Sequence, residues 1–106
     1  MTLVELDVFS GRPNPRWPLS KADARGLTAL HRRLREVAAH DASPPALGYR
    51  GFLYQQGGIG WRAWNGLVIG ADRTLADPER GVERFLASRM PPELAELRAR
   101  IQRDLR

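Results

Sequence analysis

The chain contains no cysteine among its 106 residues. Disulfide bridges, thiolate metal sites and cysteine nucleophiles are therefore excluded, and the composition suits a reducing compartment. No apolar stretch approaches the roughly 20 residues that a membrane-spanning helix needs. The first residues also lack the basic start and apolar run of a signal peptide. We therefore expect a cytoplasmic protein that does not bind membranes.

Lysine is almost absent as well: only Lys21 is lysine among the 17 basic residues, and the other 16 are arginine. The net charge is +5, but it is not concentrated in one segment, and acidic and basic residues are mixed along most of the chain. A nucleic-acid-binding protein usually gathers its positive charge on one face. The mixed signs favour an ordinary solvated surface, although arginine is well shaped to bind carboxylates and phosphates.

The length is typical of a single domain, and 42% hydrophobic and 27% charged residues are ordinary for a globular protein. Internal repeats, low-complexity tracts and interdomain linkers are all missing from the sequence. We therefore treat residues 1–106 as one domain.

The first third of the chain predicts a strand and a helix. Residues 3–9 alternate apolar and polar side chains, as in a half-buried strand. Ser20 followed by Asp23 is typical of a helix N-terminus, and an apolar stripe at helical spacing extends the predicted helix to Ala39 or His40. The turn residues at 41–45 end it.

The middle of the chain predicts a three-stranded antiparallel meander, with strands at 49–55, 61–64 and 67–69. Asn65-Gly66 is a strong hairpin signal, because both residues tolerate positive φ. Gly57 and Gly58 can form a turn or a bulge.

Two helices are expected at the C-terminal end. Asp77-Pro78-Glu79 is typical of a helix start, and Met90-Pro91-Pro92 ends that helix. The last helix then begins at Pro92-Glu93. We predict an α+β fold, in which a four-stranded, mostly antiparallel sheet is packed on one face by helices, in the order strand-helix-strand-strand-strand-helix-helix. The apolar stripe of the last helix could instead join two copies in a homodimer.

The segment 10–18, Ser-Gly-Arg-Pro-Asn-Pro-Arg-Trp-Pro, is the main candidate site. Its three prolines hold an extended shape, Arg12 and Arg16 suit a carboxylate or phosphate, and Trp17 can stack on a ring or a cation. The predicted binding residues are Ser10, Gly11, Arg12, Asn14, Arg16 and Trp17. The two guanidinium groups and the indole are expected to face outward. The alternative is a purely structural connection, with the indole in the core.

Glu5 and Asp7 form a second candidate, because residues two apart on a strand share a face. Paired carboxylates can divide acid and base roles or hold a divalent cation. No third ligand is visible nearby, which favours a polar strand face bonded to Arg50, Arg62 or Arg12. We expect no metal site and no cofactor.

His31 and His40 lie nine residues apart, on opposite sides of an ideal helix, and cannot form a metal-binding pair on consecutive turns. We expect His31 to be a packed residue with one bonded nitrogen. His40 is expected near the helix end, where a partly positive ring suits the helix dipole.

The glycine-rich stretch 57–60 is not a phosphate-binding loop, because it lacks the Gly-Lys-Ser/Thr ending and no helix follows it. The aromatic residues around it could form a stacking platform for bases. They occupy both parities along their strands, however, so some must face the core. These residues are Tyr49, Phe52, Tyr54, Trp61 and Trp64.

A strand that ends in Asp7-Val8-Phe9 and runs into Ser10-Gly11-Arg12-Pro13-Asn14-Pro15 resembles the opening of small, uncharacterised bacterial proteins. The likeness extends loosely to Tyr49-Arg50-Gly51-Phe52 and to the Asn65-Gly66 hairpin. No activity is attached to this resemblance.

The sequence favours a non-catalytic accessory or interaction domain, whose 10–18 segment binds an acidic peptide, a protein or a small anionic ligand. One alternative is a nucleic-acid-binding module that uses Arg32, Arg33 and Arg35 together with the sheet aromatics. A second alternative is a small enzyme that uses Glu5, Asp7 or His31.

Overall fold

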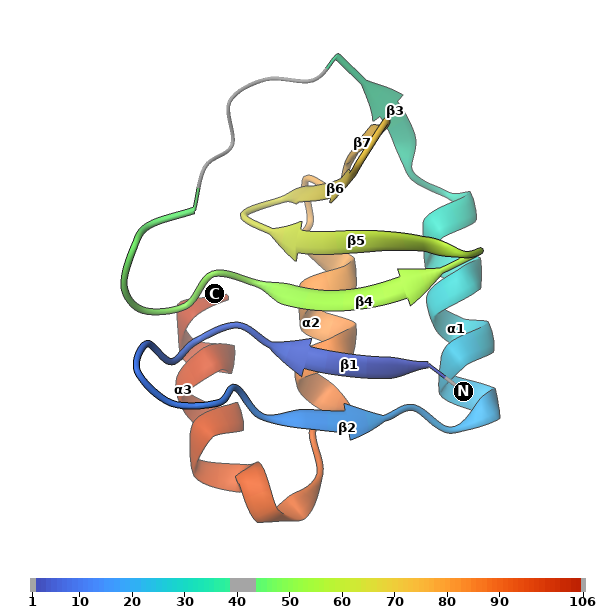
Figure 1. Ribbon diagram of the computed structural model, residues 1–106. Helices are drawn as coiled ribbons and strands as arrows, with labels where there is room; N and C mark the ends of the chain where they lie inside the picture. The colour runs from blue at the N-terminus through green and yellow to red at the C-terminus, as the bar shows by residue number, and fades with distance from the viewer. Residues whose placement is uncertain (1, 39–43, 106) are drawn as a thin grey trace.

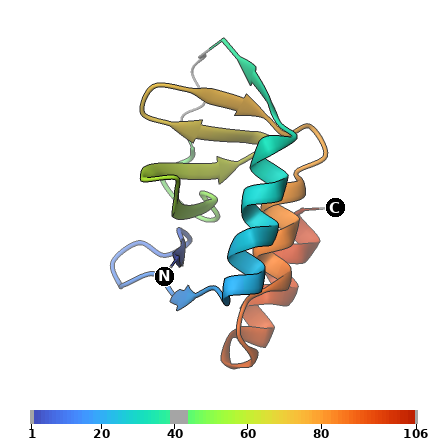
Figure 2. The ribbon, with the colours of Figure 1, turned by 90° about the vertical axis from the view of Figure 1, so that its right-hand side faces the viewer.

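The computed structural model describes residues 2–38 and 44–105. One seven-stranded antiparallel sheet forms a layer, and the helices form a second layer against one of its faces (Figure 1). No described helix covers the other face, as the perpendicular view shows (Figure 2). The predicted α+β class is confirmed, but the sheet has seven strands and not four.

The strand order across the sheet is β2-β1-β4-β5-β6-β7-β3. The strands are β1 (Leu3–Leu6), β2 (Arg16–Pro18), β3 (Arg35–Val37), β4 (Phe52–Gln56), β5 (Ile59–Trp64), β6 (Leu67–Gly70) and β7 (Thr74–Ala76). The helices are α1 (Lys21–Arg32), α2 (Gly81–Ser88) and α3 (Ala95–Asp104), and a 3-10 turn, η1 (Pro92–Leu94), precedes α3.

The predicted meander is confirmed as β4, β5 and β6. Asn65 and Gly66 turn the second hairpin with φ angles of 54° and 80°. Trp64 and Leu67 face each other across that turn, as expected. Gly57 and Gly58 turn the first hairpin with positive φ in the same way.

Three short strands were not predicted. β2 lies inside the segment expected to be a loop, and β7 lies between the predicted meander and the predicted second helix. β3 lies inside the expected first helix, which in fact ends at Arg32. The helical stripe fails there because residues 35–37 pair with β7, with Arg35 opposite Ala76 and Val37 opposite Thr74. Strands of three residues depend on their cross-strand partners more than on local propensity. The predicted helix end at residues 39–40, including His40, lies outside the described residues.

The helix starts show one confirmed cap and one shifted boundary. The Ser20 hydroxyl accepts a hydrogen bond from the Asp23 amide at 3.0 Å, which confirms the predicted N-terminus of α1. The expected start at Asp77–Glu79 is too early, since α2 begins at Gly81. The Asp77 carboxylate still caps α2, because it accepts from the amides of Gly81 and Val82 at 3.1 and 2.8 Å.

The core lies between the sheet and the helices. α2 occupies the middle of the helical layer and contacts both α1 and α3 (Figure 1). Ile101 and Leu105 on the last helix are buried within the chain, so this part of the apolar stripe packs internally. None of the described helices is both long enough and apolar enough to span a membrane.

Candidate binding site

Asn14 organises the loop that joins β1 to β2. Its side-chain oxygen accepts from the backbone amides of Val8 and Phe9 at 3.1 and 2.9 Å. Its side-chain nitrogen donates to Glu5 at 3.0 Å and to Asp7 at 3.2 Å. An asparagine amide offers two donors and an acceptor with two lone pairs, so these four bonds fill its capacity. Asn14 therefore holds the loop closed and has no group left for a ligand.

Asp7 joins the loop to the sheet through two arginines. Arg50 donates to it at 2.9 Å and Arg62 at 2.7 Å. Burial tends to raise the pKa of Asp7, but the hydrogen bonds and charges of the two arginines outweigh burial and hold the pKa below its usual value. The predicted pairing with Arg50 and Arg62 is confirmed. The described part of the chain contains no group of three or more side chains placed to hold a metal ion.

The segment Tyr49-Arg50-Gly51 supports the same corner of the molecule. The Arg50 guanidinium also donates to the carbonyl oxygen of Phe9 at 2.7 Å. Gly51 has a φ of +97°, and a Cβ at this position would lie 2.3 Å from the carbonyl oxygen of Ala63. Only glycine fits this close approach of two backbones. Arg50 and Gly51 therefore have structural roles in the segment Tyr49-Arg50-Gly51.

The expected outward position of Trp17 is wrong. The indole is only 4% exposed and packs edge-on against Phe52, with ring centroids 6.2 Å apart. The cause is the unpredicted strand β2, which pairs Trp17 with Val4 and places alternate residues on opposite faces of the sheet. Arg16 and Pro18 are exposed, and Trp17 enters the core. Its Nε1 has no hydrogen-bond partner among the described residues.

The two arginines of the predicted site diverge. Arg16 extends over the uncovered face of the sheet and pairs with Glu5 at 2.9 Å. Arg12 instead lies over the ring of Phe9, 3.8 Å from its centroid, and no acidic side chain of the described residues pairs with it. Ser10 and Gly11 are exposed next to Arg12. The structure thus divides the predicted site between two surfaces.

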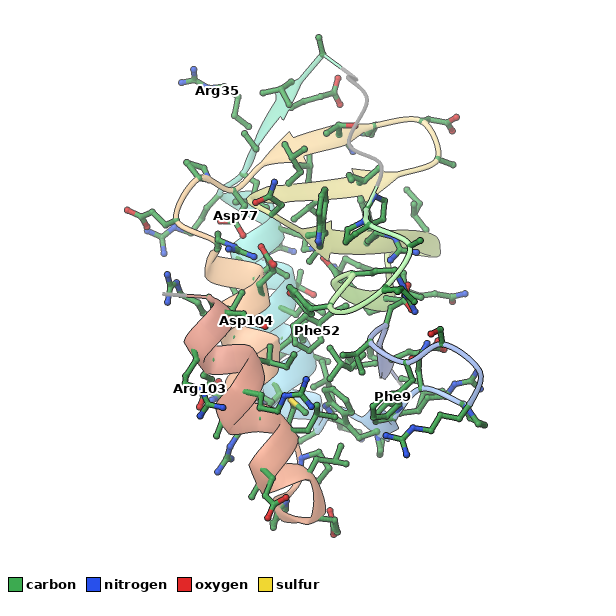
Figure 3. All side chains as sticks on the ribbon, turned by 90° about the vertical axis from the view of Figure 1, so that its left-hand side faces the viewer. Phe9, Arg35, Phe52, Asp77, Arg103 and Asp104 are labelled. Atoms are coloured by element: carbon green, nitrogen blue, oxygen red, sulfur yellow. The ribbon has the colours of Figure 1, made fainter. Side chains whose placement is uncertain are left out.

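Arg12 lines a shallow groove of 510 Å³ between this loop and the C-terminal helical segment. Phe9, Arg12 and Pro15 form the loop wall, and Figure 3 shows Phe9 on that wall. The opposite wall comes from η1 and the first turns of α3. Its residues are Pro92, Glu93, Leu94, Ala95, Glu96, Leu97 and Arg100. The groove therefore combines an apolar lining with guanidinium groups from both walls.

Three of the aromatic residues that the nucleic-acid alternative needs are buried. Phe52, Tyr54 and Trp61 are at most 5% exposed and lie on the face that the helices cover. They are not accessible for stacking on bases, which confirms the expectation that some of the aromatics face the core. Arg32, Arg33 and Arg35 are exposed at the end of α1 and the start of β3.

The three residues of the enzyme alternative do not form one site, because the Asn14 amide bridges Glu5 and Asp7 but His31 lies elsewhere. Glu5 lies on the uncovered face of the sheet, and Asp7 is bound by two arginines. His31 lies on the helix-covered side, where its Nε2 and the Tyr54 hydroxyl are 2.7 Å apart and Trp61 packs against its ring. This confirms the expected packed histidine. Burial lowers its pKa, and the positive charge of Arg73 lowers it further against the opposing effect of Asp77.

Glu83 is a buried carboxylate that the sequence analysis did not single out. It is 1% exposed and accepts from the Tyr49 hydroxyl at 2.6 Å, the Gly66 amide at 3.0 Å and Arg80 at 2.8 and 3.0 Å. Burial tends to raise its pKa, but these hydrogen bonds and the Arg80 charge lower it below the usual value. Burial and the neighbouring Glu83 raise the pKa of Tyr49 well above its ordinary value.

This network ties the β5–β6 turn to the start of α2, and all its donors are supplied by the chain itself. The signal in the sequence was the position of Glu83 beside Val82, on the buried side of the predicted helix. A carboxylate at such a position requires partners. Which residues supply them depends on the turn at Gly66 and on Tyr49, both distant in sequence.

Comparison with known proteins identifies no relative from which a role for these residues could be transferred: no family model, no curated protein and no solved structure matches the chain.

Proposed function

We propose that this protein is a non-catalytic interaction domain that binds an acidic peptide segment of a partner in the groove between the 9–15 loop and η1–α3. The observation that carries the proposal is the position of Arg12. Its guanidinium rests on the Phe9 ring at the edge of that groove, and no acidic side chain of the described residues neutralises it.

Stacking on Phe9 favours one orientation of the Arg12 guanidinium. The N–H groups along the edge of the plane remain able to bind both oxygens of a carboxylate. Because the side chain is already restrained, less conformational entropy is lost on binding. The hydrogen bonds of Asn14 and the prolines at 13 and 15 likewise restrain the backbone of the loop before a ligand binds.

The composition of the groove indicates which acidic ligand fits. Phe9, Leu94 and Leu97 supply apolar surface, and Arg100 adds a second positive charge on the opposite wall. Glu93 and Glu96 lie on that wall too, and they would repel a densely charged polyanion. A peptide with one or two carboxylates and an apolar side chain fits the apolar surface and the two arginines, and it carries too little negative charge to be strongly repelled.

The test is binding of an array of hexapeptides that each contain one glutamate and two leucines, with glutamine-for-glutamate peptides as uncharged controls. Arg12→Ala should weaken glutamate-dependent binding about tenfold, as expected for loss of a charge-assisted hydrogen bond. Arg25→Ala removes an exposed arginine from α1 and serves as the matched control. The Tm of both variants should stay close to that of the wild type.

Equal binding of the glutamate and glutamine peptides, or unchanged binding by Arg12→Ala, would overturn the proposal. A large loss of Tm in Arg12→Ala would mean that this arginine has a structural role. Single- and double-stranded oligonucleotides belong in the same experiment. Affinity for them that falls steeply with salt would support the nucleic-acid alternative instead.

A further inference from the structure

The face of the sheet that no described helix covers contains a second candidate site. It is a shallow hollow of 780 Å³ over the middle of the sheet. This is the face turned toward the viewer in Figure 1. Gly60 on β5 lies at its floor, where Trp61 next to it points into the core and Gly60 faces the opposite side.

Nothing in the local structure requires glycine at position 60. A Cβ built there meets no atom within 4 Å, and the residue is not among the glycines with positive φ. Gly70 is different, because its Cβ would lie 2.8 Å from the Trp61 ring. Glycine inside a strand weakens the sheet and often marks a place where another group approaches closely. Gly60 therefore leaves open a space that a side chain could fill.

The hollow has an apolar rim and a polar end. Leu3, Leu53 and Ile69 line it, and Leu3 is 50% exposed. Arg62 uses its Nη1 atom for Asp7 and for the Arg50 carbonyl oxygen at 2.7 and 2.6 Å. These bonds fix its position, and its Nε and Nη2 atoms make no hydrogen bond within the described part of the chain. Arg16 adds a second guanidinium, of which the side chain is 63% exposed.

We propose that this hollow binds a small planar organic carboxylate, with its ring over Gly60 and its carboxylate toward Arg62 and Arg16. A flat ring fits a floor without a side chain, and the leucines and isoleucine cover its edges. Guanidinium groups suit the oxygens of a carboxylate. Glu5 also lines the hollow and pairs with Arg16; because the Arg16 side chain is 63% exposed, rearrangement of this ion pair opposes binding only weakly. The site is on a different surface from the groove at Arg12 and does not depend on the function proposed for it.

The test uses 2-naphthoate as the probe. Its binding is measured by NMR, from changes in the backbone amide signals of the 15N-labelled protein. Its uncharged analogue, 2-naphthylmethanol, and the non-planar cyclohexanecarboxylate are the ligand controls. We expect saturable shifts at residues 53–55, 60–62 and 69–70 with naphthoate, and at least tenfold weaker binding of both controls. Signals of residues 9–15 should not change.

Gly60→Val should abolish naphthoate binding, because the valine side chain occupies the floor on which the ring would lie. Ala29→Val adds the same side chain at an exposed position of α1 and should bind like the wild type. Arg16→Ala, at an exposed site, provides a second variant that does not disturb the strand interior and should weaken binding at least threefold. Arg12→Ala should leave it unchanged, which separates this site from the groove.

Unchanged binding by Gly60→Val, equal binding of the alcohol, or shifts confined to another surface would overturn the proposal. Shifts of the same amides with protein concentration alone, in the absence of probe, would show that a second copy covers this face and would also overturn it.

Discussion

The two faces of the sheet are formed by the same strands, but they differ in how deeply their side chains are buried. On the helix-covered face, Val4, Leu6 and Phe52 are fully buried and pack into one core. On the other face, Leu3 and Arg16 are exposed and Glu5 is half-buried. In β2 this difference in burial occurs between adjacent residues: Trp17 is buried, and Arg16 extends over the open face. The core therefore depends on one set of alternate residues, and the other set is accessible to solvent.

The largest effect on the free energy of unfolding is expected from substitutions at two adjacent residues of β2. Trp17→Ala should lower the free energy of unfolding by about 3–5 kcal/mol, because it empties a large site in the core. Arg16→Ala should lower it by less than about 1 kcal/mol, since an exposed ion pair stabilises little. Urea denaturation of both variants measures the difference.

Trp17→Phe sharpens the same comparison. The indole Nε1 has no hydrogen-bond partner among the described residues, so this variant loses volume but no hydrogen bond. It should be considerably more stable than Trp17→Ala. Similar losses for the alanine variants of Trp17 and Arg16 would contradict the division between the two faces.

The second expected effect compares two carboxylates, Glu83 in the core and Glu5 on the open face. Glu83→Gln should cost about 3 kcal/mol at pH 7, because it disrupts hydrogen bonds to a buried charge. Glu5→Gln should cost less than about 1 kcal/mol. Thermal and urea unfolding of the two variants provide the measurement.

The effect of Glu83 should also depend on pH. Its pKa in the folded protein lies below the unfolded value of 4.5, so ionised Glu83 stabilises the fold above that pH. This stabilisation is lost as the pH falls through the folded pKa. The difference between the wild type and Glu83→Gln should therefore shrink below pH 4.5. A difference that grows with acidity would contradict the assignment.

The smallest expected effect concerns His31 on the covered side. Its folded pKa is below the unfolded value of 6.5, because burial disfavours the charged ring. Below pH 6.5 the unfolded chain takes up a proton more readily than the folded protein, so stability falls as the pH decreases. We expect stability to decrease from pH 7 to pH 5 for this reason.

This loss can be isolated in a His40→Gln background, in which His31 is the only histidine. Adding His31→Gln should then flatten the dependence of stability on pH between 7 and 5. The same slope with and without His31 would show that the pKa of this ring does not differ between the folded and unfolded states.

Much of the fold could be predicted because the signals lie close together in the sequence. The Asn65-Gly66 turn joins two strands whose pairing it largely sets. Ser20 caps the helix that begins next to it. Asp7 needed cationic partners, and the candidates Arg50 and Arg62 both bind it.

The candidate site was predicted less well, because its residues were grouped by their proximity in the loop. Pairing of β2 with β1 sends Trp17 inward and Arg16 outward, and Asn14 is used to close the loop. Only Arg12, with Ser10 and Gly11 beside it, remains at an exposed position near the groove. The second wall of that groove begins at Pro92, almost 80 residues further along the chain.

Local chemistry in the chain is enough to establish the class of fold, the central meander, the caps and the need of Asp7 for positive partners, since turns, caps and alternation act over a few residues. Contacts between distant segments establish the rest: the short edge strands, the burial of Trp17, the enclosure of Glu83 and the two surfaces over which Arg12 and Arg16 are divided. A three-residue strand or a buried carboxylate is stable only with partners from elsewhere, and folding alone brings those partners together.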